Sequence, residues 1–137
     1  MSISLDEMLD LLSPFGTERA NGNANHGPMA AEALFTLDRS ESVLPWIENY
    51  KTGLIEGSVA NNPISRSEWR QLLGDRGRLG DWIAFFDCEL AEHAWQDTLK
   101  EWVPPLAPAV MAAATHGLLR TCHAVRSLSM AETPQRL

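Results

Sequence analysis

The stretch that most constrains this chain covers residues 106–129, which read LAPAVMAAATHGLLRTCHAVRSLS and predict one long helix. His116 and His123 lie seven residues apart in it, with Arg120 between them. At about 100° per residue, these three side chains share one helix face with alanines and a serine, and the opposite face is apolar. A solvent-exposed face usually carries acids and lysines, and this stretch contains neither. We therefore expect the histidine face to be buried or to line a cavity.

The rest of the chain predicts further helices and no convincing strand. Residues 4–12 begin with a capping box, Ser4 and Glu7, and carry an apolar stripe at helical spacing. Further helices are predicted over residues 28–37, 43–55 and 79–102, with a short one after a second capping box at Ser65 and Glu68. The 137 residues are thus expected to form a single all-α domain, residues 1–137, a helical bundle of about five to six helices.

The composition excludes several kinds of partner. The formal net charge is −7, only Lys51 and Lys100 are lysines, and the arginines are scattered. The clustered basic surface that binds nucleic acid is therefore not predicted. No apolar run is long enough to cross a membrane, and the acidic N-terminus does not resemble a signal peptide. A cytoplasmic protein is the expectation.

The two cysteines and one of the histidines are expected to be core residues. Cys88 and Cys122 each lie within an apolar helical pattern, which predicts two buried free thiols in a reducing compartment. His93 follows Trp82 and Phe86 on one helical stripe, so we expect it to be a hydrogen-bonded core residue.

His26 precedes another predicted helix, with Asn25 as its expected N-cap and Pro28 in its first turn. A helix N-terminus favours the neutral imidazole, which is the form that binds a metal ion. His116 and His123 are about 10.5 Å apart along their helix, so they would share one metal only by leaning together, with a histidine such as His26 completing the site. The alternative is two hydrogen-bonded histidines in a helix interface.

The C-terminal residues 131–137 have the form of a helix start, with Thr133 as the cap and Pro134 at the first helical position. Few residues follow, so we interpret the chain as part of a longer ancestral domain. The alternative is a frayed C-terminal tail.

Two motifs resemble the questin oxidase-like family. Residues 25–30, NHGPMA, are similar to the asparagine-histidine motif near the start of that family. Residues 102–128, WVPPLAPAVMAAATHGLLRTCHAVRSL, resemble its proline-rich corner and the histidine-bearing helix that follows, and Glu132, Thr133 and Arg136 also fit. The resemblance runs from about residue 23 to the C-terminus and corresponds to the N-terminal part of a larger oxidase domain.

The resemblance implies an oxidoreductase, a monooxygenase or dioxygenase, that carries out oxygen-dependent oxidation or ring cleavage of a small aromatic polyketide-like substrate. One branch of the family is understood to hold non-haem iron with histidines and a modified lysine, and no lysine of this chain falls in the matching helices. Carried over by position, His26, His116 and His123 are the candidate metal ligands. Arg120 would face the same cavity as a catalytic residue, available to an anionic oxygen. The resemblance alone also implies NADPH as a cofactor.

Two other hypotheses remain open at this point. The oxidoreductase interpretation includes a short form that is itself inactive, and the first alternative to it is a non-catalytic helical module that binds a small hydrophobic molecule or mediates dimerisation. The second is a half-domain completed by another chain, either in a homodimer or by a missing C-terminal partner.

Overall fold

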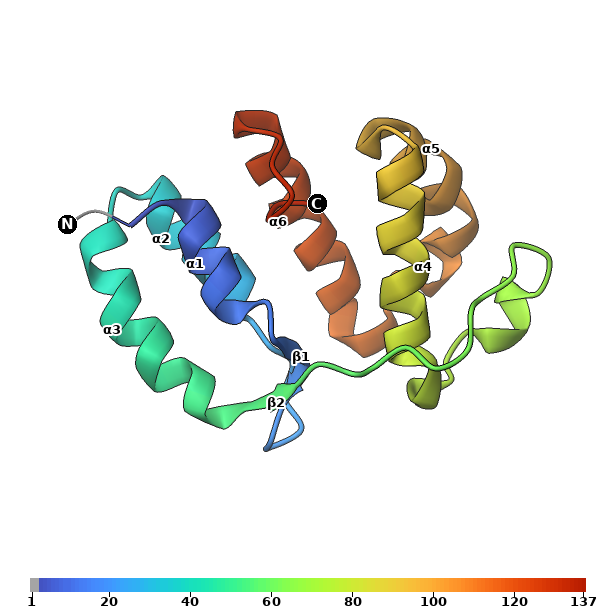
Figure 1. Cartoon of the computed structure of the whole chain (residues 1–137), viewed down its shortest axis with the longest axis horizontal. Coiled ribbons are helices and arrows are strands. Elements are labelled where there is room, and N and C mark those ends of the chain that lie inside the picture. Colours follow the sequence, from blue (N-terminus) through green and yellow to red (C-terminus); the bar gives the residue numbers. More distant parts are fainter. Residues whose placement is uncertain (1–2) are drawn as a thin grey trace. The chain divides into compact units, whose positions relative to one another are not determined.

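The computed structural model describes residues 3–137, which are mostly helical (Figure 1). The chain divides into two compact units, one formed by the residues up to 57 together with residues 109–137, the other by residues 58–108. Residues 3–137 contain six α-helices and one two-stranded sheet, which confirms the predicted helical class. That residues 1–137 form a single domain stays a prediction.

The first unit carries every residue of the candidate site. Its regular elements are α1 (Leu5–Leu12), β1 (Phe15–Arg19), α2 (Gly27–Thr36), α3 (Ser40–Tyr50), β2 (Leu54–Glu56) and α6 (His116–Met130). A 3-10 turn follows α3 at Lys51–Gly53, and another precedes α6 at Ala112–Thr115.

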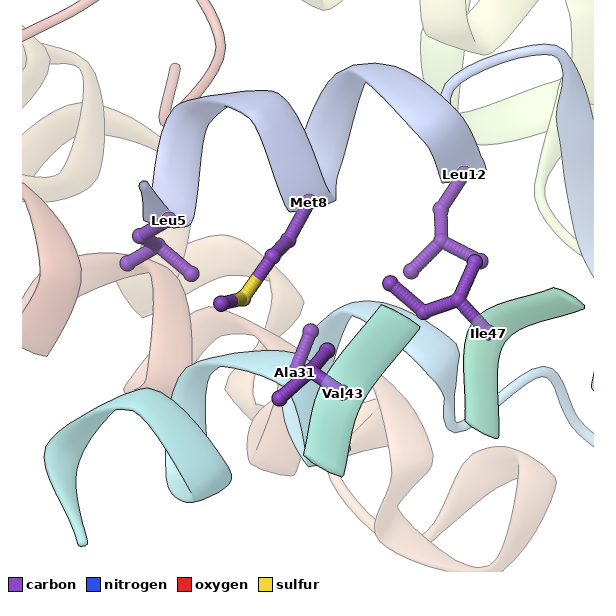
Figure 2. Packing of buried hydrophobic residues seen from close by; sticks show 6 residues of the cluster. All are labelled: Leu5, Met8, Leu12, Ala31, Val43 and Ile47. Carbon is purple, nitrogen blue, oxygen red and sulfur yellow. The ribbon is translucent and has the colours of Figure 1, made fainter. Parts of the chain in front are cut away.

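Helix α1 forms as the sequence predicts. The Ser4 hydroxyl accepts a hydrogen bond from the Glu7 N–H at 3.2 Å, and the Glu7 carboxylate accepts one from the Ser4 N–H at 2.8 Å. Its apolar stripe is buried against α2 and α3, and the core consists of Leu5, Met8, Leu12, Ala31, Val43 and Ile47 (Figure 2). Burial of this stripe is what holds α1, α2 and α3 together.

The small sheet is the part of the first unit that the sequence analysis missed. β1 and β2 pair antiparallel, with Phe15 opposite Glu56 and Arg19 opposite Leu54. β1 and β2 thus lie where no strand is predicted, and the helix expected over residues 43–55 ends early, at Tyr50. Neither FGTER nor LIE shows the apolar–polar alternation that signals a half-buried strand.

The second unit has an aromatic core. It contains α4 (Leu79–Glu92) and α5 (Trp95–Leu106), with 3-10 turns at Trp69–Leu72 and Arg76–Arg78. The buried rings of Trp69 and Trp102 have centroids 5.3 Å apart, and Trp82, Phe85 and Phe86 pack against them. The helix expected after Ser65 is only a single 3-10 turn.

The predicted helix over residues 79–102 is interrupted at His93. This residue has an extended backbone (φ −130°, ψ 153°) and an exposed side chain, so the core position expected for it is wrong. The proline-rich corner is also displaced, because Pro104 and Pro105 lie in the last turn of α5 and the helix ends at Leu106.

The long helix predicted over residues 106–129 is wrong in its first part. Ala113, Ala114 and Thr115 have φ values of 50°, 50° and 64°, and α6 begins only at His116. Alanine has the highest helix propensity, so nothing local in the sequence indicates this break. What the turn provides is a carbonyl at Ala113 that contacts the His116 ring.

Several side chains expected to be buried are exposed. Cys88 and Cys122 are exposed free thiols, and Val110, Met111 and Leu118 on the apolar face are also exposed. For Leu118 and Cys122 the cause lies in the orientation of α6: its histidine face contacts α2, as His123 does through Glu32. The opposite face of α6 is therefore exposed at these two residues.

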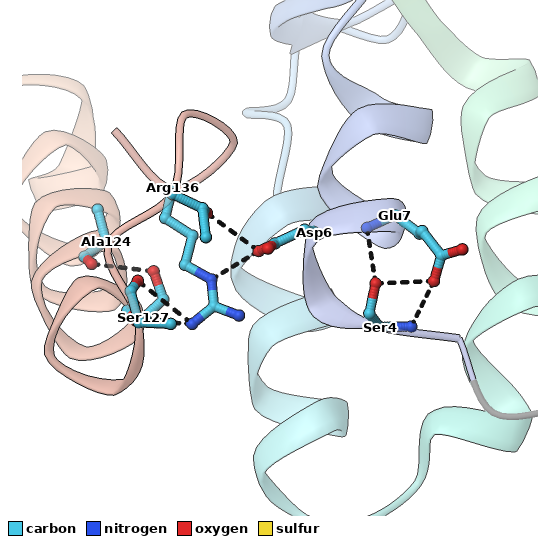
Figure 3. Close-up of polar contacts among 8 residues, drawn as sticks. Ser4, Asp6, Glu7, Ala124, Ser127 and Arg136 are labelled. Carbon is cyan, nitrogen blue, oxygen red and sulfur yellow. Dashed lines mark hydrogen bonds and ion pairs between the residues drawn. The ribbon is translucent and has the colours of Figure 1, made fainter.

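The C-terminal segment folds back on α1 (Figure 3). Arg136 donates a hydrogen bond to the Asp6 carboxylate at 2.7 Å and another to the Ser127 carbonyl at 3.0 Å, and Thr133 reaches Asp6 at 3.2 Å. The predicted helix start is a single turn in which the Thr133 carbonyl accepts from the Arg136 N–H.

None of the helices within residues 3–137 is both long and apolar enough to cross a bilayer.

Candidate functional site

Two of the predicted ligands meet directly. The Nε2 atoms of His26 and His116 lie 2.8 Å apart, and the ring centroids are 4.8 Å apart with the rings edge to face. His26 is the N-cap of α2 and His116 is the first residue of α6, so the contact joins the starts of two helices. The contact brings together residues that are 90 positions apart in the sequence.

The second nitrogen of His116 decides which atom carries the proton. Its Nδ1 lies 2.6 Å from the carbonyl oxygen of Ala113, and a carbonyl only accepts. Nδ1 of His116 therefore carries a hydrogen, and in the neutral ring Nε2 presents a lone pair. It follows that His26 Nε2 is the donor in the contact between the rings. Histidines that bind metal ions usually donate the N–H of their other ring nitrogen to a carbonyl or carboxylate, as His116 Nδ1 does here.

His26 is held in place by its neighbours. The buried Asn25 side chain donates to the Gly16 carbonyl at 2.8 Å and accepts from the Gly27 N–H at 2.9 Å. The His26 N–H donates to the Tyr50 hydroxyl at 2.8 Å. The cap prediction is thus wrong by one residue, although the Asn25 oxygen does bind the first N–H of α2. A Cβ at Gly27 would lie 2.9 Å from that oxygen, so the contact requires glycine.

His123 belongs to a different cluster. Its Nδ1 lies 2.6 Å from Oε2 of Glu32, a side chain on α2 that is only 2 % exposed. Arg126 donates to both carboxylate oxygens, at 2.8 Å and 2.5 Å, and Thr36 donates to Oε1 at 3.0 Å. Within residues 3–137, no three side chains of the His, Cys, Asp or Glu type are placed to hold one metal ion.

The charge of Glu32 follows from these contacts. Burial raises the pKa of the Glu32 carboxyl, but hydrogen bonds from Arg126, His123 and Thr36 lower it, and the net pKa lies below the ordinary value of 4.5. Glu32 is therefore ionised at neutral pH, and the guanidinium of Arg126 balances its charge.

Arg120 lies one helical turn beyond His116 and is half-buried. Burial lowers the pKa of its guanidinium, which remains a cation at neutral pH. One Nη atom is 3.4 Å from the carbonyl oxygen of Asn25, a long contact. The ion pairs found among residues 3–137 leave this arginine without a carboxylate partner. Its donors are thus available beside the histidine pair.

The structure therefore brings His26, His116 and Arg120 together and places His123 with Glu32. Glu32 and Tyr50 are not among the residues predicted from the sequence. A signal for Glu32 does exist, because it is the only charged residue in the otherwise apolar or uncharged helix GPMAAEALFT. A buried carboxylate needs charged or hydrogen-bonding partners, and in this case they come from α6.

Histidine side chains contributed by facing helices are characteristic of helical proteins that bind metal ions or transfer protons. The questin oxidase-like family matches residues 24–127, which include all of these side chains, and the chain belongs to that family. The family name points to an oxidoreductase-type role. Neither the curated proteins nor the solved structures contain a match to this chain.

Proposed function

We propose that this chain is a questin oxidase-like oxidoreductase that uses non-haem iron in the oxygen-dependent oxidation or ring cleavage of an aromatic polyketide-like substrate. Family membership supports the reaction class. The observation that carries the metal proposal is the 2.8 Å separation of the two Nε2 atoms of His26 and His116.

The geometry of this pair fits two adjacent ligands of one ion. Metal–nitrogen bonds of about 2.0–2.1 Å at a right angle place two nitrogens about 3 Å apart. In its neutral Nδ1–H form His116 presents a lone pair at Nε2, and a neutral His26 would need to move its hydrogen from Nε2 to Nδ1. Bound iron would supply the redox chemistry with oxygen.

The remaining residues have distinct proposed roles. His123 is the third proposed ligand, although within residues 3–137 it lies with Glu32 and no three such side chains are placed to hold one ion, so it would have to move toward the pair. Its Nδ1 faces Glu32, so Nε2 is the nitrogen that it would offer. Arg120 would bind an anionic oxygen of the substrate, such as a phenolate, because its donors lie beside the pair without an acidic partner. Neither role requires a residue outside the first unit.

The test is metal binding by the full chain purified anaerobically. Titration with Fe²⁺, or with Co²⁺ as a spectroscopic probe, is expected to give one site per chain. His26→Ala and His116→Ala should each weaken binding by at least tenfold. His93→Ala is the matched control, because His93 is exposed and lies in the other unit. Unchanged binding in both site variants would contradict the metal proposal.

A non-catalytic binding or dimerisation module is the second candidate. The observation in its favour is the exposed apolar face of α6, where Leu118 is 47 % exposed and Cys122 is also exposed. This function predicts binding of a planar aromatic compound that survives EDTA, or a dimer in sedimentation experiments that Leu118→Gln disrupts. A monomer that binds aromatics only when loaded with metal would count against it.

A further inference from the structure

Glu32 has no assigned role in the proposed reaction, although its buried carboxylate accepts hydrogen bonds from the side chains of His123, Arg126 and Thr36. We infer that Glu32 is a positioning residue for His123: its carboxylate fixes the ring as the Nδ1–H tautomer and so leaves Nε2 as the nitrogen available for chemistry. Metal binding by His123 Nε2 rests on the proposed function, whereas the tautomer of the ring does not.

The hydrogen-bond arrangement leaves one solution for the ring. Oε2 of Glu32 faces His123 Nδ1 at 2.6 Å and Arg126 Nη2 at 2.5 Å, and Oε1 faces Arg126 Nε at 2.8 Å and the Thr36 hydroxyl at 3.0 Å. An ionised carboxylate only accepts, so His123 Nδ1 must carry a hydrogen. The neutral imidazole then has its lone pair on Nε2.

Arg126 is the charged partner of the buried carboxylate in this arrangement. Glu32 is buried and needs a cation, and the two-pronged contact of Arg126 supplies it. The carboxylate therefore does not need a second positive charge from His123. The other group bonded to the carboxylate is the uncharged hydroxyl of Thr36. The trio of Glu32, Arg126 and neutral His123 has no net charge.

A purely structural role is the competing explanation, since the same contacts join α2 to α6. Such a role predicts that Glu32 variants change stability alone. A positioning role predicts that Glu32 variants also change the tautomer of the His123 ring, which a stability measurement does not detect. Partners of this kind typically influence metal affinity by 10–100-fold when the histidine is a ligand.

The direct experiment is ¹⁵N NMR of the histidine rings in the metal-free full chain. In the wild type, His123 is expected to show a protonated Nδ1 that exchanges slowly with water and an unprotonated Nε2. A wild-type ring that is mainly Nε2–H would overturn the inference without any variant. This measurement remains decisive even if substitutions at Glu32 prevent folding.

Glu32→Gln supplies the second arm. Each carboxylate oxygen already faces a donor of Arg126, so the amide NH₂ cannot be placed without facing one of them, and the acceptor for Nδ1 is lost or weakened. We expect the Nε2–H tautomer of His123 to rise from the minor to the major form, with circular dichroism unchanged. Thr36→Val is the matched control, because it removes a bond to the same carboxylate and leaves the His123 contact intact. A folded Glu32→Gln chain with the wild-type tautomer would overturn the inference.

Co²⁺ titration separates this inference from the proposed function. If the wild type binds Co²⁺, Glu32→Gln should weaken binding about 10–100-fold and Thr36→Val should not. If the wild type binds no Co²⁺ but shows the Nδ1–H tautomer that Glu32→Gln reverses, the metal proposal fails and the positioning role of Glu32 stands. Equal Co²⁺ affinities for wild type and Glu32→Gln would show that Glu32 does not act on the metal through His123.

Discussion

The ring of His116 is hydrogen-bonded to the carbonyl of Ala113, three residues earlier, across a turn in which three consecutive non-glycine residues have positive φ. L-residues avoid this region because Cβ approaches the following carbonyl, at a cost of roughly 1–2 kcal/mol each. Strain of this kind persists only where the surrounding structure maintains it, and it is frequent at functional sites.

Glycine should relieve this strain. We expect Ala113→Gly and Ala114→Gly each to raise the free energy of unfolding, by about 0.5–1 kcal/mol, because glycine adopts positive φ without the steric cost. Ala112→Gly is the control: Ala112 lies in the same turn but is not among the residues with positive φ, so glycine there should destabilise by about 0.5–1 kcal/mol. Urea denaturation measures all three, and equal losses in all three variants would contradict the argument.

Glu32 should make stability depend on acidity. Its pKa is lower in the folded chain than its ordinary value of 4.5, so its contribution is complete above that value and is lost as the pH falls through the folded pKa. The free energy of unfolding is therefore expected to drop on acidification more in the wild type than in Glu32→Gln. Asp97→Asn, at an exposed position, should leave the acid profile almost unchanged. Parallel profiles for wild type and Glu32→Gln would refute this prediction.

The contact between Asp6 and Arg136 should stabilise the first unit. The Arg136 side chain is only 9 % exposed, so removing its partner leaves a nearly buried cation. We expect a coupling energy of about 1 kcal/mol from a double-mutant cycle with Asp6→Asn and Arg136→Met. The same cycle on the exposed pair Asp97 and Lys100 should give close to zero. No difference between the two cycles would show that burial of Arg136 is unimportant.

Gly80 should not tolerate a side chain. A Cβ at this position would lie 2.5 Å from the carbonyl oxygen of Val59, which is backbone and cannot easily move. Gly80→Ala is therefore expected to destabilise by about 1–3 kcal/mol in thermal or urea unfolding. Gly117→Ala, where nothing lies within 4 Å of the added Cβ, should instead stabilise α6 by up to about 1 kcal/mol. A neutral Gly80→Ala would mean that the backbone at Val59 can shift.

Local signals in the sequence were sufficient for some elements. Ser4 and Glu7 define the start of α1 because a capping box involves only four adjacent residues, and the stripe after it faces the core as expected. The break before His116 could not be predicted, since alanines favour the helix that they interrupt there. The strands β1 and β2 are stabilised by each other rather than by their own sequences.

Some features of the candidate site could likewise be predicted from the sequence, and others could not. That His116 and Arg120 share a helix face follows from their spacing. The metal interpretation expects His26 near His116, but it also expects His123 with them, and His123 lies with Glu32 instead. The partner of His123 could not be predicted, because Glu32 lies 91 positions away and only the packing of α2 on α6 brings it there. The exposed cysteines show the converse: an apolar pattern predicts burial only if another element covers that face.

The division of the chain has a consequence for how the site is assembled. The first unit consists of the residues up to 57 together with residues 109–137. The second unit, residues 58–108, lies between these two segments in the sequence and is therefore an insertion. During synthesis, α1, α2 and α3 leave the ribosome long before α6, and the histidine pair cannot form until the second unit and His116 have emerged. Contacts of such high sequence separation form slowly because loop closure must come first. Pairing of His26 with His116 is thus a late event in folding, and binding of a metal at this pair would report that the first unit is complete.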